Sequence, residues 1–245
     1  GKTACGSTAA MAADEAAKQS LTSLPAANVC GAGTYAVSPS SWEARALFQS
    51  PVTVRREEPN VLVLDMARYC FDGKNLEGPD EILRADNLLR ERLNLPPRRA
   101  ALAQPWTRQG DKKPYPITLL YTIRCAQEIK DVRLALESRK ESKIFLDGIQ
   151  IENQQDGYYV DPCIETVALP DLTAGDHELK LETDFTAKVN LEAMYLLGDF
   201  DVEIQGSSAV LKRTRKNYHW GSLTEQGMPF YGGNAVYETE LDLEA

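Results

Sequence analysis

Hydrophobic and polar residues alternate along most of the chain from Asn60 onward. In "VLVLDMARYCF" the side chains of Leu62, Leu64 and Met66 share one face, which is the period of a β-strand. After Pro116 the alternation is nearly continuous and is interrupted by short turn signals. Further strands are predicted at "ITLLYTIRC", "VRLALES", "CIETVALP", "HELKLETDF", "LEAMYLLGDFDVEI" and "AVYETELDL".

Two local patterns are more specific than this alternation. "KIFLDGIQIE" reads as two short strands joined at Asp147 and Gly148, a dipeptide that adopts the positive φ angles of a two-residue hairpin turn. "GPDEILRADNLLRERLNLPP" has apolar residues at helical spacing, with Pro79 and two acidic residues in the first turn and a stop before Pro96. The sequence therefore predicts one helix within a β-rich chain.

Short strands with turns between them and a single helix indicate an antiparallel β-sandwich of jelly-roll type. We expect this sandwich to occupy residues 56–245. Residues 1–55 are rich in alanine and then in glycine, serine and proline, and predict an irregular peripheral segment. The last strand, in "YETELDLEA", is expected to pair within the domain, because an open edge promotes aggregation, although it could also begin another domain.

Composition excludes several classes of partner. The net charge of −9 argues against nucleic acid, and the basic run at 212–216 is interpreted as a solvated strand or loop. No apolar run approaches the roughly 18 residues of a membrane span. The five cysteines are widely spaced and predict neither a disulfide framework nor a zinc site. They lean toward a reducing compartment such as the bacterial cytoplasm, but exported bacterial proteins also carry free cysteines, so both locations stay open. We expect no cofactor and no metal.

Motifs for common catalytic chemistries are absent from the sequence. There is no G-x-S-x-G, the chain has two histidines, and the glycines at 31 and 33 lack the strand and helix of a phosphate-binding loop. Glycoside hydrolysis needs only two carboxyl groups about 5 to 10 Å apart, which sequence alone does not select. Glu192, Asp199 and Glu225 lie in the stretches most like motifs and are the candidates for such a pair.

The order of segments from about residue 55 to residue 245 resembles a known arrangement. "NVLVLDMARYCFDG", the helix, "QPW", "KIFLDGIQI", "GYYVDPCIETVALPDLTAGDHELKLE", "NLEAMYLLGDFDV" and "GSLTEQGMPFYGGNAVYETEL" are together similar to the β-sandwich region of large bacterial glycoside hydrolases of the α-L-rhamnosidase-like and family 2-like type. "EQGMPFYGG" followed by a strand is the most specific of these segments, whereas "LDG" stands where related hairpins often have Asn-Gly.

The resemblance implies a galactose-binding-domain-like fold and an accessory role. In that family such sandwiches accompany a separate catalytic domain, which this chain is too short to hold, so no catalytic residues carry over. The expected partners are a carbohydrate and the remainder of the parent glycoside hydrolase. The alternative is a purely structural module that supports the catalytic domain, and a third hypothesis is a small glycosidase or lyase in its own right.

Two aromatic segments are candidates for carbohydrate binding, because an aromatic ring stacks on the apolar face of a sugar while polar neighbours bond its hydroxyls. The first is the loop "QQDGYYVDP" with Tyr158, Tyr159 and Asp161. The second is "WGSLTEQGMPFYGG", which suits a packed corner of the sandwich equally well. Its candidate residues are Trp220, Glu225, Gln226 and Tyr231.

Overall fold

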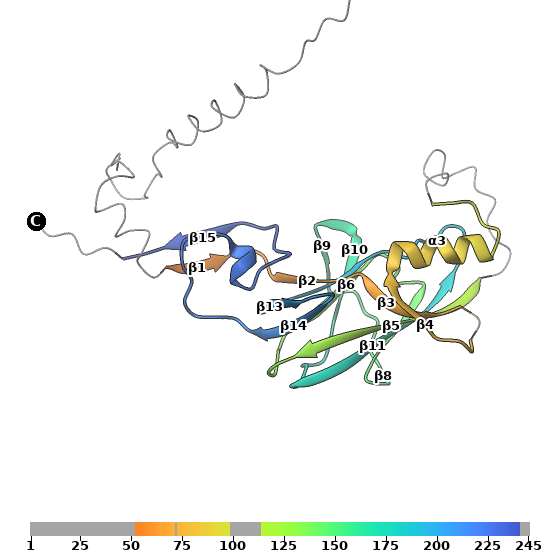
Figure 1. The fold of residues 1–245 in the computed structure, drawn as a ribbon, viewed down its shortest axis with the longest axis horizontal. Coiled ribbons are helices and arrows are strands. Elements are labelled where there is room, and N and C mark those ends of the chain that lie inside the picture. The colour runs from red at the N-terminus through yellow and green to blue at the C-terminus, as the bar shows by residue number, and fades with distance from the viewer. Residues whose placement is uncertain (1–51, 72, 99–113, 241–245) are drawn as a thin grey trace, which may run out of the picture. The chain divides into compact units, whose positions relative to one another are not determined.

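The computed structural model describes residues 52–71, 73–98 and 114–240. Residues 1–51 of the expected N-terminal segment therefore lie outside the described residues, as do the segment "QPW" and the last five positions. The strands and helices of the described part all belong to one compact unit. This unit is mostly β, with almost entirely antiparallel sheets and one α-helix, which confirms the predicted fold class at that level (Figure 1).

One of the two main sheets has five strands. In spatial order they are β2 (Asn60–Leu64), β12 (Met194–Gly198), β6 (Arg133–Leu136), β10 (Asp161–Ala168) and β9 (Gly157–Tyr159). Every neighbouring pair in this sheet is antiparallel.

The larger sheet has eight strands. Six follow in the spatial order β13 (Phe200–Gln205), β14 (Ser208–Arg213), β5 (Tyr115–Cys125), β11 (Gly175–Phe185), β7 (Ser142–Leu146) and β8 (Ile149–Gln150). The edge of β5 also pairs with β3 (Met66–Cys70), which in turn pairs with β4 (Glu77–Glu81). The single parallel pairing in the described chain joins β14 to β5.

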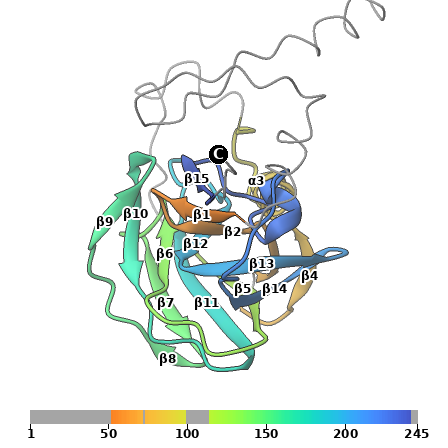
Figure 2. The ribbon, with the colours of Figure 1, turned by 90° about the vertical axis from the view of Figure 1, so that its left-hand side faces the viewer.

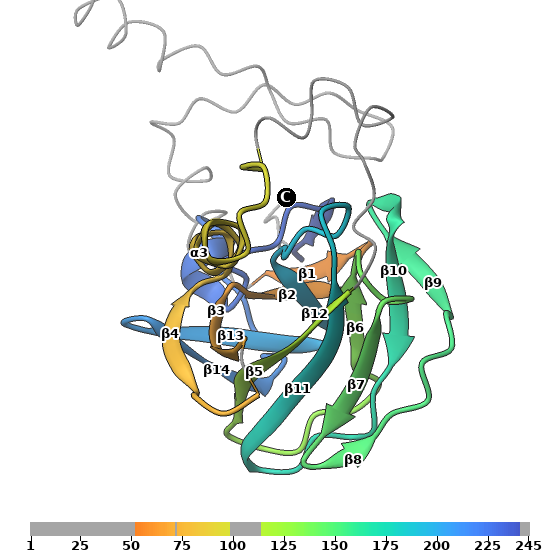
Figure 3. The same cartoon turned by 90° about the vertical axis from the view of Figure 1, so that its right-hand side faces the viewer.

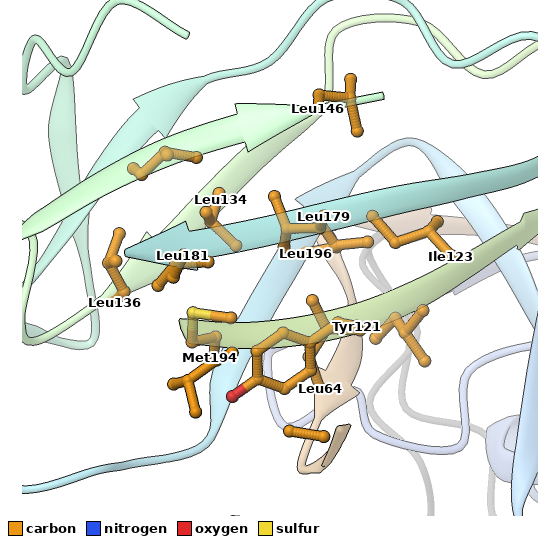
Figure 4. Close-up of a cluster of buried hydrophobic side chains, with 14 of the residues drawn as sticks. Leu64, Tyr121, Ile123, Leu134, Leu136, Leu146, Leu179, Leu181, Met194 and Leu196 are labelled. Carbon is orange, nitrogen blue, oxygen red and sulfur yellow. The ribbon is translucent and has the colours of Figure 1, made fainter. Parts of the chain in front are cut away.

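The core lies between the two sheets, where their inner faces meet (Figure 4). Alternate residues of each strand point inward, so the period of two in the sequence becomes one dry face for each sheet. The five-stranded sheet contributes Leu64, Leu134, Leu136, Met194 and Leu196, and the larger sheet contributes Tyr121, Ile123, Ile144, Leu179 and Leu181. These side chains are almost completely buried and form one continuous cluster.

Two stretches that read as single strands are each split between the sheets. Asp65 separates β2 from β3, and Asp199 separates β12 from β13. At each aspartate the chain leaves the five-stranded sheet and enters the larger one. At Asp199 the buried positions stay in phase across the crossing, so the pattern does not reveal the break. At Asp65 the phase shifts by one residue, because Met66 is 39 % exposed and Ala67 and Tyr69 are buried instead. The expectation that Met66 shares the face of Leu62 and Leu64 is therefore wrong.

The helix α3 (Ile82–Arg92) starts later than predicted. Pro79 lies in β4, and Glu81 caps the helix by accepting hydrogen bonds from the backbone N–H groups of Leu83 (3.0 Å) and Arg84 (3.1 Å). The acidic residue at position 81 therefore serves the helix from its cap and not from its first turn. Figures 2 and 3 show α3 beside β4, on the opposite side of the sandwich from β9 and β10.

A buried ion pair anchors this helix. Arg90 donates from Nε to Asp86 at 2.6 Å and from Nη2 to the carbonyl of Val189 at 2.8 Å, and Asp86 accepts from the backbone N–H of Leu191. Asp86 lies on the buried face of the helix. The charge is tolerated there because its partner and its hydrogen bonds are buried with it.

A separate ribbon joins the first and last described strands. β1 (Thr53–Arg56) and β15 (Ala235–Glu238) pair antiparallel over four residues each. The last described strand does pair, but its partner is β1 and not a strand of either main sheet. β1 lies almost entirely before residue 56, in the segment that was expected to be irregular. No helix among residues 52–71, 73–98 and 114–240 is long and apolar enough to cross a membrane.

Candidate functional site

The segment 220–233 is a packed corner. It contains the 3-10 helix η2 (Leu223–Gln226), whose last residue is fully buried. The Gln226 side chain accepts from the backbone N–H of His219 (2.8 Å) and donates to the carbonyls of His219 (2.9 Å) and Ser222 (3.2 Å). Met228 is also fully buried. The hydrogen-bonding groups of Gln226, a predicted sugar-binding residue, are therefore used inside the loop.

The other residues predicted in this segment lie at its margins. Trp220 stacks on Tyr237 of β15 with ring centroids 5.3 Å apart. Glu225 is exposed on η2. Tyr231 donates its hydroxyl toward the carbonyl of Asn234 (2.6 Å) and the carboxylate of Glu58 (2.9 Å). These residues are thus not arranged as one aromatic platform.

The predicted loop at 157–161 is open, and it forms part of β9 and β10. Tyr158 is 62 % exposed and Val160 is 81 % exposed. Tyr158 lies opposite Glu165 in the register, so Tyr159 points to the other face of the sheet. Asp161 accepts a hydrogen bond from the backbone N–H of Cys163 at 2.8 Å, which lowers the pKa of the Asp161 carboxyl and fixes the turn.

Tyr159 meets Tyr195 on the outer face of the five-stranded sheet. The two ring centroids are 5.3 Å apart at an interplanar angle of 50°, and both side chains are partly exposed. Beneath them lies a small apolar cluster of Val61, Ala135 and Leu197. We call this surface, with the partly buried Val63 and Ile164 beside the rings, the tyrosine face.

Polar side chains border the tyrosine face. Arg133 lies two residues before Ala135 on β6, on the same side of the sheet, and donates from Nε to Asp156 at 2.8 Å. Thr166 donates to the other oxygen of Asp156 at 2.6 Å. Burial raises the pKa of Asp156, but the bonds from Thr166 and Arg133 outweigh it, so the pKa lies below its ordinary value. The rings thus stand beside a fixed carboxylate and a fixed guanidinium.

A cleft continues from this border. Its larger part, of about 510 Å³, is lined by residues of β1, by Glu58 and Arg133, and by the segment that follows β14. A smaller adjoining part of about 310 Å³ is lined by residues 128–131 and by Arg213. Asp131 and Asp199 line both parts. We call the two parts together the end cleft.

Two arginines of the end cleft, Arg56 and Arg215, are held by fixed partners. Arg56 donates to the carbonyl of Phe200 (3.4 Å) and pairs with Asp199, which also accepts from Thr214 (2.9 Å). Arg215 donates from Nε to the buried Asp201 at 2.8 Å and lies over the ring of Tyr218. The positions of these guanidinium groups are therefore set by the fold before any ligand arrives.

Glu58 lies between the packed corner and the tyrosine face. Its carboxylate accepts from the backbone N–H of Asn234 (2.7 Å) and from Tyr231, and these bonds lower its pKa. The pKa of Tyr159 is raised by burial first, and then by the neighbouring Tyr195 and by the charge of Glu58. Glu58 thus connects two regions that the sequence treated separately.

The three carboxylates that were candidates for a glycosidase pair lie in different surroundings. Only Asp199 lines the end cleft. Glu192 pairs with Arg98, and Glu225 is exposed on η2. Within the described part of the chain, no group of three or more His, Cys, Asp and Glu side chains is arranged to hold a metal ion.

The histidines have structural partners. His177 faces the carboxylate of Asp147 from Nδ1 (2.6 Å) and the carbonyl of Thr173 from Nε2 (2.9 Å). Burial works to lower the pKa of His177, but these two acceptors raise it more. His219 lies beside the carbonyl of Trp220. Each ring therefore has a role in fixing a turn.

Sequence reasoning missed Tyr195 and most of the end cleft. Tyr195 lies inside "LEAMYLLGDF", which reads as an ordinary strand, and it meets Tyr159 only because β9, β10, β6 and β12 are neighbours in the sheet. The cleft residues come from several separate segments of common charged residues. The basic run at 212–216 was the one available signal, because Arg213, Thr214, Arg215 and Lys216 all line the end cleft.

The chain was compared with known proteins at the level of both sequence and fold. It matches no protein-family model, no curated protein and no solved structure.

Proposed function

We propose that this chain is a non-catalytic carbohydrate-binding module of a larger glycoside hydrolase, and that it binds a glycan on the tyrosine face. The observation that carries the proposal is the partly exposed pair of Tyr159 and Tyr195 on the outer face of a sheet. Aromatic rings held in this way offer an apolar surface to a sugar at little cost in conformational entropy.

The polar border supplies the second requirement of a sugar site. The hydroxyls of a bound sugar need donors and acceptors whose positions are already fixed. Arg133, Asp156 and Thr166 form such a group beside the rings, joined by bonds of 2.8 and 2.6 Å. Stacking and hydrogen bonding are thus available on one continuous surface.

The proposal includes a jelly roll of the galactose-binding-domain type, and the way the chain crosses between the sheets supports this part of it. From β5 onward the chain crosses repeatedly between the sheets: β5, β7, β8, β11, β13 and β14 belong to the larger sheet, and β6, β9, β10 and β12 to the five-stranded sheet. Repeated crossing between two sheets is a property of jelly rolls. The tyrosine face is the outer surface of one of these sheets.

Substitution within the tyrosine pair tests this function. Screening of the whole chain on a glycan array and by affinity gel should identify a bound glycan. Tyr159→Ala and Tyr195→Ala are each expected to weaken its binding about tenfold, equivalent to about 1.4 kcal/mol. Tyr158→Ala is the matched control, because it removes the same side chain from the opposite side of β9 and should change binding less than about twofold.

Two results would contradict the proposal. The first is full binding by Tyr159→Ala and Tyr195→Ala proteins that keep the wild-type circular dichroism spectrum. The second is no binding of wild-type protein to a broad panel. The second result favours the alternative, a module that supports a separate catalytic domain. The observation that favours this alternative is the exposure of Tyr158 (62 %) and Val160 (81 %), which offers apolar surface to a neighbouring domain.

A further inference from the structure

The end cleft differs in charge from the rest of the chain. The whole sequence has 27 Lys and Arg against 36 Asp and Glu. The end cleft reverses this balance, because six basic side chains and four carboxylates line it. A concave surface concentrates the field of such an excess.

Two of the basic side chains are anchored in a way that leaves their outer edge free. Arg133 and Arg215 each donate from Nε, to Asp156 and Asp201 respectively, at 2.8 Å. A guanidinium has five N–H groups, so both terminal nitrogens of each arginine remain able to bond another oxyanion. This terminal edge forms the two-pronged donor that matches a carboxylate or sulfate group.

Two more basic residues in the end cleft have no competing partner. The side chains of Arg213 and Lys216 are exposed, and neither forms an ion pair within the described part of the chain. Their neighbours Lys212 and Arg215 are, by contrast, paired with Glu203 and Asp201. The basic run therefore has two members that are paired with carboxylates of the protein and two whose charge is not compensated by an ion pair among the described residues.

The end cleft adjoins the tyrosine face through Arg133. On β12 and β6 the pair Tyr195 and Ala135 is followed, two residues along each strand, by the pair Leu197 and Arg133. Two residues of a strand span roughly 7 Å, which is close to the length of one sugar ring. An oligosaccharide on the tyrosine rings can therefore extend its next residue into the end cleft.

We infer that the end cleft binds an anionic sugar residue, one with a carboxylate or a sulfate group, next to a residue stacked on the tyrosine face. This inference rests on the proposed function and defines its substrate class. Arg133 and Arg215 bond the oxyanion with their terminal edges, and Arg213 and Lys216 supply the uncompensated positive charge. The ligand is thus an acidic oligosaccharide and not a neutral one.

Matched pairs of glycans test the substrate class, with binding to the 245-residue chain measured by calorimetry. One pair is an oligogalacturonate and its methyl ester, and the other is a sulfated galactan oligosaccharide and its desulfated form. In one of the two pairs, the charged member should bind at least tenfold more tightly than its neutral counterpart. The pair that shows this difference tells whether the end cleft recognises a carboxylate or a sulfate. The affinity of its charged member should also fall as salt is added.

A charge-matched pair of variants locates the site. Arg213→Gln/Lys216→Gln removes two charges from the end cleft without breaking an ion pair, and should weaken binding of the charged glycan at least tenfold. Lys143→Gln/Lys188→Gln removes two exposed lysines that do not line the cleft, and should change the affinity for the charged glycan less than twofold. Equal losses in both double variants would overturn the inference.

The outcomes separate this inference from the proposed function. Equal binding of the charged and neutral members in both pairs, with loss in Tyr159→Ala, overturns the anionic substrate and leaves the carbohydrate module standing. No binding of any glycan overturns both. A single-stranded oligonucleotide of equal charge that binds as tightly as the charged glycan overturns the sugar class.

Discussion

Two aromatic segments of this chain have similar compositions and opposite environments. The segment 220–233 buries Gln226 and Met228 completely and stacks Trp220 on a strand of the ribbon. The segment 157–164 leaves Tyr158 62 % exposed and Val160 81 % exposed. The first closes a corner of the sandwich, and the second forms an edge of a sheet.

Backbone geometry and buried hydrogen bonds account for the difference. In the packed segment one amide side chain makes three hydrogen bonds, and Gly227 follows it with φ of +87°. In the open segment Asp161 bonds only the backbone two residues further on. Aromatic content alone therefore does not distinguish the packed corner from the open segment. In this chain the two are distinguished by the buried amide of Gln226 and the glycine that follows it.

The largest expected effect on stability comes from substitution of Gly227, which lies in the packed corner. A Cβ at this position would lie 2.5 Å from Cγ of Asp201, which is buried, and the positive φ strains any other residue. We expect Gly227→Ala to lower the free energy of unfolding by about 3 kcal/mol, from strain and overpacking together. Urea denaturation followed by circular dichroism measures this.

The control for Gly227→Ala is the same substitution five residues later. Gly232 lies in the same segment, and a Cβ added there would have no other atom within 4 Å. Gly232→Ala should change stability by less than about 0.5 kcal/mol. Similar losses in the two variants would show that the segment is not packed as described.

A smaller effect is expected when the amide of Gln226 is removed. Gln226→Ala deletes three hydrogen bonds from a fully buried position, and should cost about 2 kcal/mol of stability. Gln205→Ala, which removes an exposed glutamine from the end of β13, should cost less than about 0.5 kcal/mol. Equal midpoints of thermal unfolding for the two variants would contradict this account of the corner.

Much of the fold could be predicted from sequence because it depends on local patterns. Alternation identified most of the strands, although β1, β4, β9 and β14 were not predicted. Asp147 with Gly148 identified the hairpin between β7 and β8. The breaks at Asp65 and Asp199 were missed, because each half of a stretch that changes sheets has a period of two of its own. At Asp65 the buried positions shift by one residue, from Leu64 to Ala67, which the sequence pattern did not show. Pro79 was placed in the helix because proline is common in a first turn, whereas here Glu81 caps the helix after β4.

The candidate site was less accessible to sequence reasoning. Tyr159 was identified as an aromatic residue in a loop, but its neighbour Tyr195 depends on the order of four strands in space. The end cleft depends on an even longer-range arrangement. Arg56, Arg133 and Arg215 meet there from segments about 80 residues apart in the chain, and each is unremarkable in its own segment. Such sites become visible only when the sheet order is known.

The two adjacent tyrosines of the open segment differ in how they pack. Tyr159 covers the small cluster that contains Ala135, whereas Tyr158 packs against little. Tyr159→Ala should lower the free energy of unfolding by about 1 kcal/mol, and Tyr158→Ala by less than about 0.5 kcal/mol. Urea denaturation of both variants measures the difference. The reverse order would place Tyr158, and not Tyr159, against the sheet.

The smallest effect concerns Glu58, which connects the two segments. Its pKa is lowered by the backbone N–H of Asn234 and by the hydroxyl of Tyr231, so its charged form is favoured in the folded state. The resulting stabilisation is fully present above about pH 4.5 and is lost as the pH falls through the lowered pKa of the folded protein. Glu58→Gln removes the ionisable group, and so removes this dependence.

Unfolding in urea at a series of pH values, for wild-type protein and Glu58→Gln, should show this linkage. We expect the wild-type protein to be slightly more stable at pH 7 and the difference to shrink as the solution becomes acidic. Asp161→Asn is a useful comparison, because the Asp161 carboxyl also has a lowered pKa but bonds only its own turn. If the gap between wild-type protein and Glu58→Gln is constant from pH 7 to strong acid, the ionised carboxylate of Glu58 does not stabilise the fold through Asn234 and Tyr231.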